Sequence, residues 1–187
     1  MVMPQATSRW TAAMVRALPD DGKRYEVIDG ELFVTPAPSL RNQRALALLF
    51  EWLRSCATGA AGVGEVLWSP ADISTRDDRL VQPDVFVIPT VPGQPPLQDW
   101  SDVSHLLLAV EVLSPSTARA DRQVKPRLYR EIADEYWIVD LDGRVVERWR
   151  RDDQRPEIIT DRLAWQPAGG ELFELALGPF FDRVGPG

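Results

Sequence analysis

The sequence predicts one domain, residues 1–187, of the α/β (α+β) class, with a mixed β-sheet flanked by helices. Three observations indicate this class. Helical and strand-like segments alternate along the chain, two Asp-Gly turns join alternating apolar runs, and one strongly apolar strand follows residue 105. With 187 residues, 44% of them hydrophobic, the chain can form one core without a disulfide or a structural metal. The expected elements, in chain order, are a helix at 7–19, a hairpin at 24–36, a helix at 40–57, strands at 64–75, 79–89 and 105–115, a helix at 117–133 and a hairpin at 135–151.

Local signals support the elements of the first third. Ser8 or Thr11 can cap the first helix, which has apolar residues at helical spacing until Pro19 stops it. Asp29-Gly30 is a strong signal for a type I′ hairpin turn. Ser39 precedes the amphipathic stretch LRNQRALALLFEWLRSCA and is expected to cap it.

The remaining elements have similar signals. Asp77-Asp78 marks a turn between two strands, and the Pro-rich connection from Pro89 to about Ser104 has no regular pattern. The stretch HLLLAVEVLSP is expected to be a central strand, buried on both faces. Pro126 disturbs the helix that follows, and Asp142-Gly143 turns the second hairpin. From about Gln154 we expect only short strands and a Pro/Gly-rich end.

Charge and cysteine content limit the functional classes. The net charge of −7 disfavours a protein that coats nucleic acid, because binding many phosphates needs surplus Lys and Arg. The single cysteine, Cys56, favours a reducing, cytoplasmic setting. No targeting segment or membrane span is expected.

Glu111 is the most informative residue. It lies within LLLAVEVL, where an unpaired buried carboxylate would cost several kcal/mol, so a partner must compensate it. Glu111 therefore either pairs with an arginine, lies at the frayed end of its strand before Ser114-Pro115, or belongs to a functional site. Buried carboxylates with perturbed pKa values cluster at functional sites.

Asp84 is a second candidate carboxylate, which can lie beside Glu111. It starts the strand DVFVI, where an acidic residue also fits a simple turn. If the two strands are antiparallel neighbours, both carboxylates converge at one edge of the sheet. Such a pair suits Mg²⁺ or Mn²⁺, whereas one His and one Cys at distant positions make no zinc site.

Lys125 follows Glu111 on the next helix. It is either a solvated residue or a group that leans over the carboxylates and stabilises charge on a phosphate. Asp121 lies one helical turn earlier and can hold Lys125 or reach the metal. The basic residues of this segment outnumber Asp121 and predict a nucleic-acid-binding stripe, formed by Arg119, Arg122, Arg127 and Arg130.

Three blocks of sequence carry a family resemblance. LPDDGKRYEVIDGELFVTPAPSLRNQ, VQPDVFVI and EVLSPSTARADRQVKPRLYREIADEYWIVD, in this order and spacing, resemble the Uma-type restriction endonuclease family of the PD-(D/E)XK nuclease superfamily. The resemblance is strongest over residues 11–150. It implies a restriction-endonuclease-like fold, Mg²⁺-dependent hydrolysis of phosphodiesters and a homodimer.

The resemblance also implies roles for individual residues. Asp84 stands in the PD position and Glu111 in the second acidic position, and with the backbone carbonyl of Val112 they would hold Mg²⁺ (or Mn²⁺). The superfamily lysine position is occupied by Leu113, but Lys125 matches the lysine that the Uma-type family carries on the following helix. Two further residues are expected as additional ligands or supporting groups: Glu26, which matches a family carboxylate, and Asn42, which stands where the family usually has His.

The expected protein is therefore a metal-dependent endonuclease that acts on nucleic acid, with DNA as the expected substrate. Its expected catalytic residues are Asp84, Glu111 and Lys125. Two alternatives stay open. One is a non-catalytic nucleic-acid-binding or regulatory module that keeps the nuclease fold. The other is a structural protein in which Asp84 and Glu111 merely pair with arginines.

Overall fold

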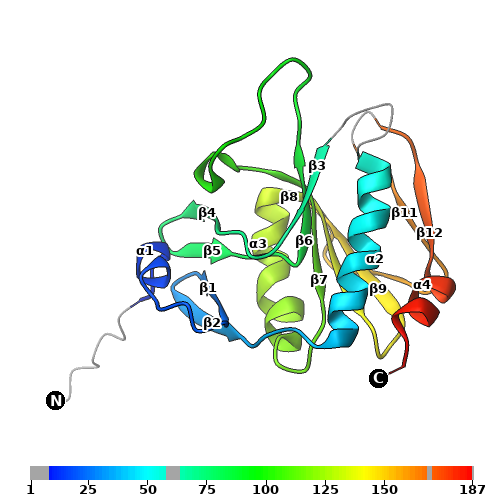
Figure 1. Ribbon diagram of the computed structural model, residues 1–187, viewed down its shortest axis with the longest axis horizontal. Coiled ribbons are helices and arrows are strands. Elements are labelled where there is room, and N and C mark those ends of the chain that lie inside the picture. The colour runs from blue at the N-terminus through cyan, green and yellow to red at the C-terminus, as the bar shows by residue number, and fades with distance from the viewer. Residues whose placement is uncertain (1–8, 58–63, 168–169, 187) are drawn as a thin grey trace.

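A mixed six-stranded sheet forms the centre of the protein, seen in a computed structural model that describes residues 9–57, 64–167 and 170–186 (Figure 1). Strands β7 and β8 run parallel, whereas every other neighbouring pair in this sheet is antiparallel. The sheet is therefore mixed, as predicted. Its strands, in spatial order, are β10 (Glu157–Ile159), β9 (Val145–Arg150), β8 (Ala133–Asp140), β7 (Leu106–Val112), β6 (Val85–Pro89) and β3 (Gly64–Trp68).

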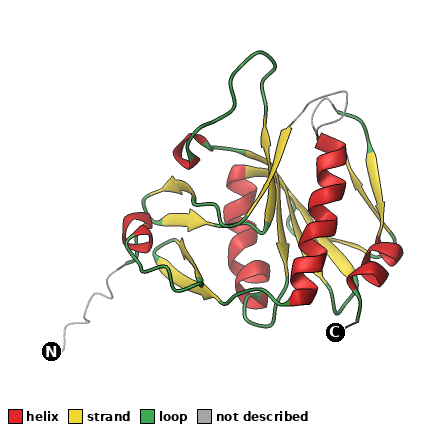
Figure 2. Cartoon of the chain, viewed as in Figure 1, coloured by secondary structure: helices red, strands yellow, loops and turns green. Residues whose placement is uncertain are grey.

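Two helices cover the opposite faces of this sheet (Figure 2). On one face, α2 (Leu40–Ala57) buries Leu49 and Leu53 against side chains such as Val110. On the other face, α3 (Lys125–Ile132) packs near Ala109, the preceding residue of β7. Successive residues of a strand point to opposite faces, so β7 is covered on both sides, as its apolar sequence predicts.

A smaller four-stranded sheet lies beside the large one. In spatial order its strands are β2 (Glu31–Thr35), β1 (Arg24–Ile28), β5 (Arg79–Val81) and β4 (Ile73–Arg76). The β1–β2 turn has φ of 50° at Asp29 and 85° at Gly30, which confirms the type I′ turn signal. Helix α1 (Ala12–Arg16) packs on this sheet, and Thr11 caps it by accepting a hydrogen bond from the Met14 N–H; Ser8 lies outside the described residues.

Four sequence expectations were wrong in detail. The segment 64–75 is two strands, β3 and β4, in different sheets, because the chain turns at Ser69-Pro70. The segment 79–89 is likewise two strands, β5 in the small sheet and β6 in the large one, separated by residues 82–84. The second hairpin turns over four residues, and its positive φ is at Arg144 rather than at Asp142-Gly143. The C-terminal part contains a helix, α4 (Leu177–Val184), beside the short strands β11 (Arg162–Trp165) and β12 (Phe173–Ala176).

The Pro-rich connection contains no strand; its regular part is a 3₁₀ turn at Trp100–Asp102. Within the described ranges 9–57, 64–167 and 170–186, no helix combines the length and apolar character needed to cross a membrane.

Candidate active site

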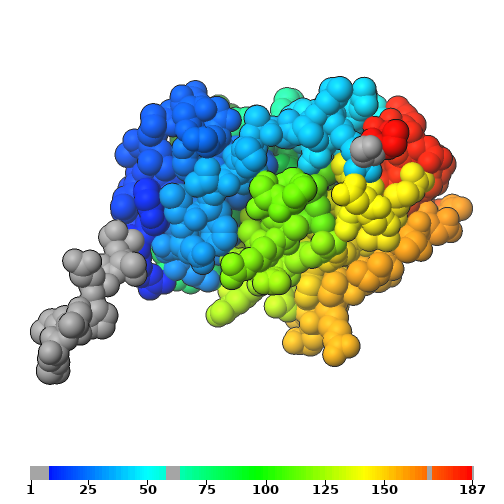
Figure 3. All heavy atoms as spheres, turned by 90° about the horizontal axis from the view of Figure 1, so that it is seen from below, coloured from blue at the N-terminus to red at the C-terminus, as the bar shows by residue number. Residues whose placement is uncertain are grey.

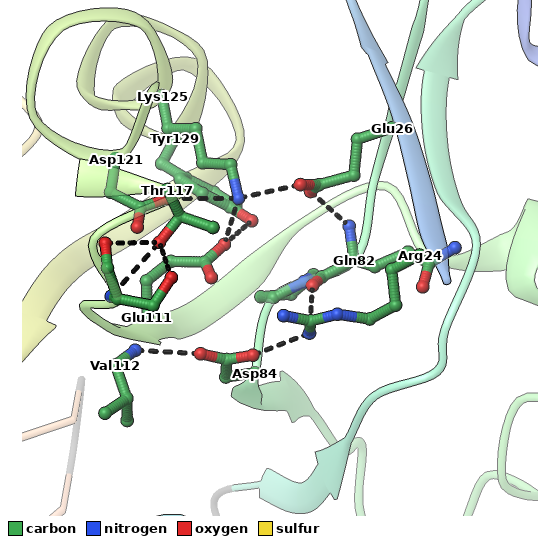
Figure 4. Close-up of polar contacts among 12 residues, drawn as sticks. Arg24, Glu26, Gln82, Asp84, Glu111, Val112, Thr117, Asp121, Lys125 and Tyr129 are labelled. Carbon is green, nitrogen blue, oxygen red and sulfur yellow. Dashed lines mark hydrogen bonds and ion pairs between the residues drawn. The ribbon is translucent and has the colours of Figure 1, made fainter. Parts of the chain in front are cut away.

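Asp84 and Glu111 meet where the two sheets join. Asp84 directly precedes β6, and Glu111 is the sixth of the seven residues of β7. The two strands are antiparallel neighbours with Val85 opposite Val110, which confirms that the start of one lies beside the end of the other. Both carboxylates are buried, with residue exposures of 6% and 2%. They therefore belong to one buried cluster, shown in Figure 4.

Glu111 is held from the α3 side of the sheet. Its Oε1 accepts hydrogen bonds from Lys125 Nζ at 2.8 Å and from the Tyr129 hydroxyl at 3.1 Å. Its Oε2 accepts no hydrogen bond from any residue in the described part of the chain. One oxygen is thus fixed by the protein, while the other is available to a ligand.

Lys125 is buried, with 2% exposure, and does not point to solvent. Its ammonium contacts three carboxylates: Glu111 Oε1 at 2.8 Å, Glu26 Oε2 at 2.9 Å and Asp121 Oδ1 at 3.3 Å. The ammonium therefore donates a hydrogen bond to Glu111 and forms ion pairs with two further carboxylates. The solvated-face alternative for Lys125 is wrong.

A helical irregularity sets the position of Lys125. Residues Ala120–Val124 form a π-helical turn, and α3 starts at Lys125 with Pro126 in its first turn. Helical residues run without a break from Ala118, so Pro126, which lacks an N–H, lies just after the π turn, and the expected disturbance of the helix is found there. The π turn places Asp121 and Lys125 on the same buried side, and such turns often occur at functional sites.

Asp84 is held by Arg24 and by the end of β7. Its Oδ1 accepts from Arg24 Nη1 at 2.6 Å, and its Oδ2 accepts from the Val112 N–H at 2.8 Å. Sequence reasoning missed Arg24, although a signal existed. Arg24 lies two positions before Glu26 on β1, so the two side chains share one face of that strand.

Glu26 links the small sheet to the cluster. Its Oε2 contacts Lys125 Nζ, and its Oε1 accepts the Gln82 N–H at 2.9 Å. Tyr129, which was also missed, lies four residues after Lys125 and hence on the same helix face. Glu26 thus holds Lys125 in place, and Tyr129 holds Glu111 in place.

Asn42 contacts the end of β7 from α2. Ser39 Oγ accepts the Asn42 N–H at 3.2 Å, which confirms Ser39 as the cap of α2. The Asn42 side-chain Nδ2 donates to the carbonyls of Val112 at 3.4 Å and Leu113 at 3.3 Å. Asn42 therefore contacts the same Val112 carbonyl that was expected to hold a metal.

The charges of the cluster do not balance. Four carboxylates (Glu26, Asp84, Glu111 and Asp121) surround two cations (Arg24 and Lys125). Burial raises the pKa of Glu111 well above its usual range; Lys125 opposes this rise, and the neighbouring acids add to it. Burial also raises the pKa of Asp121. Although burial alone disfavours an ammonium, Glu111, Glu26 and Asp121 raise the pKa of Lys125, which stays charged. The cluster can thus accept further positive charge.

The donor atoms fit a hard divalent cation. Asp84, Glu111 and Val112 line one pocket of about 230 Å³, and they offer two carboxylates and a backbone carbonyl. Mg²⁺ is commonly bound by one or two carboxylates together with waters and substrate phosphates. No group of three or more His, Cys, Asp or Glu side chains that could hold a metal occurs in the part of the chain that the structure describes. The residues therefore fit a magnesium site that the substrate helps to complete, not a cage made by the protein alone.

The basic stripe is divided by the structure. Arg122 pairs with Asp140 at 2.7 Å and with Glu147 at 2.6 Å, and Arg130 donates to the Pro126 and Asp153 carbonyls. Arg119 and Arg127 are exposed, and Arg127 lies on the solvent side of α3, whereas Lys125 is on its buried side. Three pockets, of about 230, 330 and 620 Å³, adjoin the carboxylate cluster, and of these four arginines only Arg122 lines any of them.

Three adjoining pockets form a groove across the site. The central pocket shares Arg24 and Asp84 with a larger pocket of about 620 Å³ on one side. On the other side it shares Asn42 and Ser114 with a pocket of about 330 Å³ that Arg122 also lines. We call these three pockets the groove. Its central pocket lies between residues 111–117 and the start of α2, and Figure 3 shows the face of the molecule on which the green segment after β7 adjoins the blue segment that leads into α2.

Comparison with known proteins identifies the family of the chain. A family model described as "Uma2: Putative restriction endonuclease" matches residues 12–178. The chain belongs to the Uma2 family. Membership of the Uma2 family supports a nuclease, and it agrees with the resemblance seen in the motif blocks.

A solved structure shows the same fold. It is described as a putative nuclease belonging to DUF820 from Anabaena variabilis ATCC 29413 and has 17% identity and a TM-score of 0.72, covering 93% of this chain and 98% of that one. The type IIG restriction endonuclease BpuSI matches with 14% identity and a TM-score of 0.39, over 79% of this chain and 16% of its own. No curated protein matches the chain. The first likeness shows that this Uma2 member has the mixed α+β fold of a nuclease-like protein.

Proposed function

We propose that this protein is a Mg²⁺- or Mn²⁺-dependent endonuclease of the PD-(D/E)XK type, which hydrolyses phosphodiester bonds of DNA. One observation carries the proposal: Lys125 contacts Glu111 inside a buried cluster that also contains Asp84, beside a pocket that both carboxylates line. A purely structural ion pair needs neither an uncompensated excess of carboxylates nor a groove through which a ligand can reach them.

Each residue would have a separate task. Asp84, Glu111 and the Val112 carbonyl would hold the cation, which would supply Lewis-acid chemistry by activating a water molecule and neutralising charge on the scissile phosphate. Lys125 opposes the rise that burial causes in the pKa of Glu111, and it fixes Oε1, which leaves Oε2 for a ligand. Tyr129, Glu26 and Asp121 hold the Glu111–Lys125 pair in place. In the overall reaction water adds to phosphorus, and the bond from phosphorus to the leaving sugar oxygen breaks.

Arg24 favours a second candidate, a structural protein without catalysis in which Asp84 is paired with an arginine. Its guanidinium already neutralises Asp84 Oδ1, which is the structural pairing considered from sequence. Under the nuclease proposal, the cation must displace Arg24 from this oxygen or share it. Under the alternative, Arg24 stays, and the cluster is held by its two internal cations and by protons.

The setting of the reaction is also proposed. We place the protein in the cytoplasm, where nucleic acid is accessible and where the unpaired Cys56 stays reduced. We propose a homodimer, since two copies can cut two strands. Light scattering after gel filtration measures the mass, and a monomeric mass with DNA bound would contradict the dimer.

The test is incubation of the purified protein with DNA and with RNA, in Mg²⁺ or Mn²⁺, beside the Glu111→Gln and Lys125→Ala variants. The proposal expects cleavage by the wild type and loss of cleavage in both variants. Cleavage unaffected by either substitution would exclude the site. Absence of cleavage in every condition would favour the binding module.

A further inference from the structure

The largest of the three pockets has features that phosphodiester hydrolysis does not need. This pocket, of about 620 Å³, adjoins the site through Arg24 and Asp84 and lies between α2, the end of β3 and the start of β1. Its volume is in the range of small-molecule sites. Its apolar lining includes Leu46, Phe50 and Trp68. It therefore offers a mainly apolar cavity next to a strongly charged cluster.

Trp68 is exposed in this pocket. Its residue exposure is 58%, although its indole packs edge-on against Phe50, with ring centroids 4.7 Å apart. A large aromatic left open to solvent beside an apolar cavity offers a stacking surface. The position is set by the sheet, since Trp68 pairs with Val85 and the next N–H, that of Ser69, donates to the Asp84 carbonyl. The indole is thus tied to the strand that carries a candidate metal ligand.

Gln82 is a second and independent feature of this pocket. It is 8% exposed and lines the pocket, and its amide Nε2 is fixed by Asp72 Oδ1 at 2.9 Å and the Tyr25 carbonyl at 3.4 Å. Its Oε1 is buried and has no hydrogen-bond partner among the residues that the structure describes. Buried acceptors normally have partners, so this unsatisfied oxygen is unusual; solvent does not reach it, and a ligand N–H meets it only if the Gln82 side chain turns toward the pocket.

From these features we propose that the Trp68 pocket binds one unstacked nucleobase of the strand whose phosphodiester lies at Asp84 and Glu111. This inference rests on the proposed nuclease function, because it takes the occupant from the substrate of that site. The base stacks on the indole, and one of its N–H groups meets Gln82 Oε1. The other end of the groove, near Arg122, receives the continuation of the strand.

Two properties of the groove favour a nucleobase over another apolar ligand. The pocket shares four lining residues (Arg24, Pro38, Leu46 and Asp84) with the central pocket of the phosphodiester site, so a nucleotide occupying both needs no separate entry. Arg24 lies at this junction with its cationic group, where the sugar–phosphate backbone would pass. Every nucleobase offers a π-face, whereas the buried acceptor demands a polar edge.

The test uses short single-stranded DNA that contains one 2-aminopurine, whose fluorescence is quenched on stacking, in EDTA so that no cleavage occurs. The wild type and Trp68→Phe should bind this DNA and quench the probe. Trp68→Ala should bind about 5- to 150-fold more weakly, the range that corresponds to loss of one base–aromatic stack. Trp100→Ala is the matched control, because Trp100 is an exposed aromatic outside the groove.

The outcomes separate this inference from the proposed function. Absence of quenching by the wild type, or equal binding by Trp68→Ala, would overturn the base pocket even if the protein cleaves DNA in Mg²⁺. Quenching that depends on Trp68, without cleavage in Mg²⁺ or Mn²⁺, would support the pocket and contradict the nuclease. Self-association that depends on Trp68, without quenching, would assign the pocket to a second copy and overturn the inference.

Discussion

Lys125 Nζ lies 2.8 Å from Glu111 Oε1, and both residues are almost fully buried. The two residues are fourteen positions apart, on α3 and on the central strand β7, so the contact depends on the tertiary fold. A second and a third carboxylate, from Glu26 and Asp121, share the same ammonium. The stability and the chemistry of the protein should therefore both depend on this pair.

Replacing Lys125 by Met should strongly destabilise the fold. The substitution leaves Glu26, Glu111 and Asp121 buried without their cation, a change that typically costs about 3–5 kcal/mol. Urea unfolding at neutral pH measures the loss. Lys23→Met, at an exposed lysine paired with Asp21, should leave the midpoint unchanged. Equal stability of Lys125→Met and the wild type would show that the cluster does not need this cation.

The stability of the protein should depend on pH through Glu111. Burial raises the pKa of Glu111 in the folded state, so between its ordinary value and this raised value only the folded state holds the proton. The free energy of unfolding should therefore decrease as pH rises through that window, and less so in Glu111→Gln. The raised pKa of Lys125 acts only at alkaline pH, where its contribution is lost as pH rises through the folded-state value. Urea titrations of both proteins across this window test the difference, and parallel curves would contradict it.

Some residues of the candidate site could be predicted from the sequence, and others could not. The apolar surroundings of Glu111 and the antiparallel adjacency of two strands were enough to predict that Asp84 and Glu111 converge. The role of Arg24 was not predicted, because its partner Asp84 is sixty residues away and the β1–β5 pairing within the small sheet, which brings β1 beside the segment leading from β5 to Asp84, has no local signal. The ion pairs of Arg122 within the predicted Arg stripe were not foreseen, since Asp140 and Glu147 reach Arg122 only through the fold.

The fold, too, contains local features that the sequence predicts and a helix that it does not. The Asp29-Gly30 turn and the capped helix α2 are local features, and the sequence predicted both. Helix α4 was missed because Gly178 and Pro179 near its start mimic a loop, although proline is tolerated in a first turn. It is stabilised by packing, since Phe180 and Phe181 join the same core as α2. Tertiary contacts, not propensity, decide this helix.

Replacing Arg24 by Gln should tighten the binding of Mn²⁺. Arg24 neutralises Asp84 Oδ1, so its removal increases the excess negative charge and frees one ligand oxygen. Isothermal titration calorimetry without DNA should give a dissociation constant several-fold lower than that of the wild type. Arg79→Gln is the control, because Arg79 is also an ion-paired arginine of the small sheet but its partners are Asp29 and Glu131, not Asp84. Unchanged or weaker Mn²⁺ affinity in Arg24→Gln would exclude competition at Asp84.

Arg122 and Arg127 should differ in DNA binding. Arg122 lines the groove, whereas Arg127 lies on the exposed side of α3. Arg122→Gln should therefore weaken binding at all sequences and lower the slope of log K against log salt by about 1, and Arg127→Gln should leave that slope unchanged. Fluorescence anisotropy across a salt series measures both. Equal effects of the two substitutions would restore the single basic stripe expected from sequence.

The central claim is that Asp84 and Glu111 act together on a phosphodiester, and single-turnover cleavage of DNA in Mn²⁺ tests it most directly. The rates of Asp84→Asn and Glu111→Gln should fall to background, while Glu131→Gln, a carboxylate paired with Arg79 outside the groove, should cleave at the wild-type rate. A folded Glu111→Gln variant that cleaves as fast as the wild type would contradict the claim.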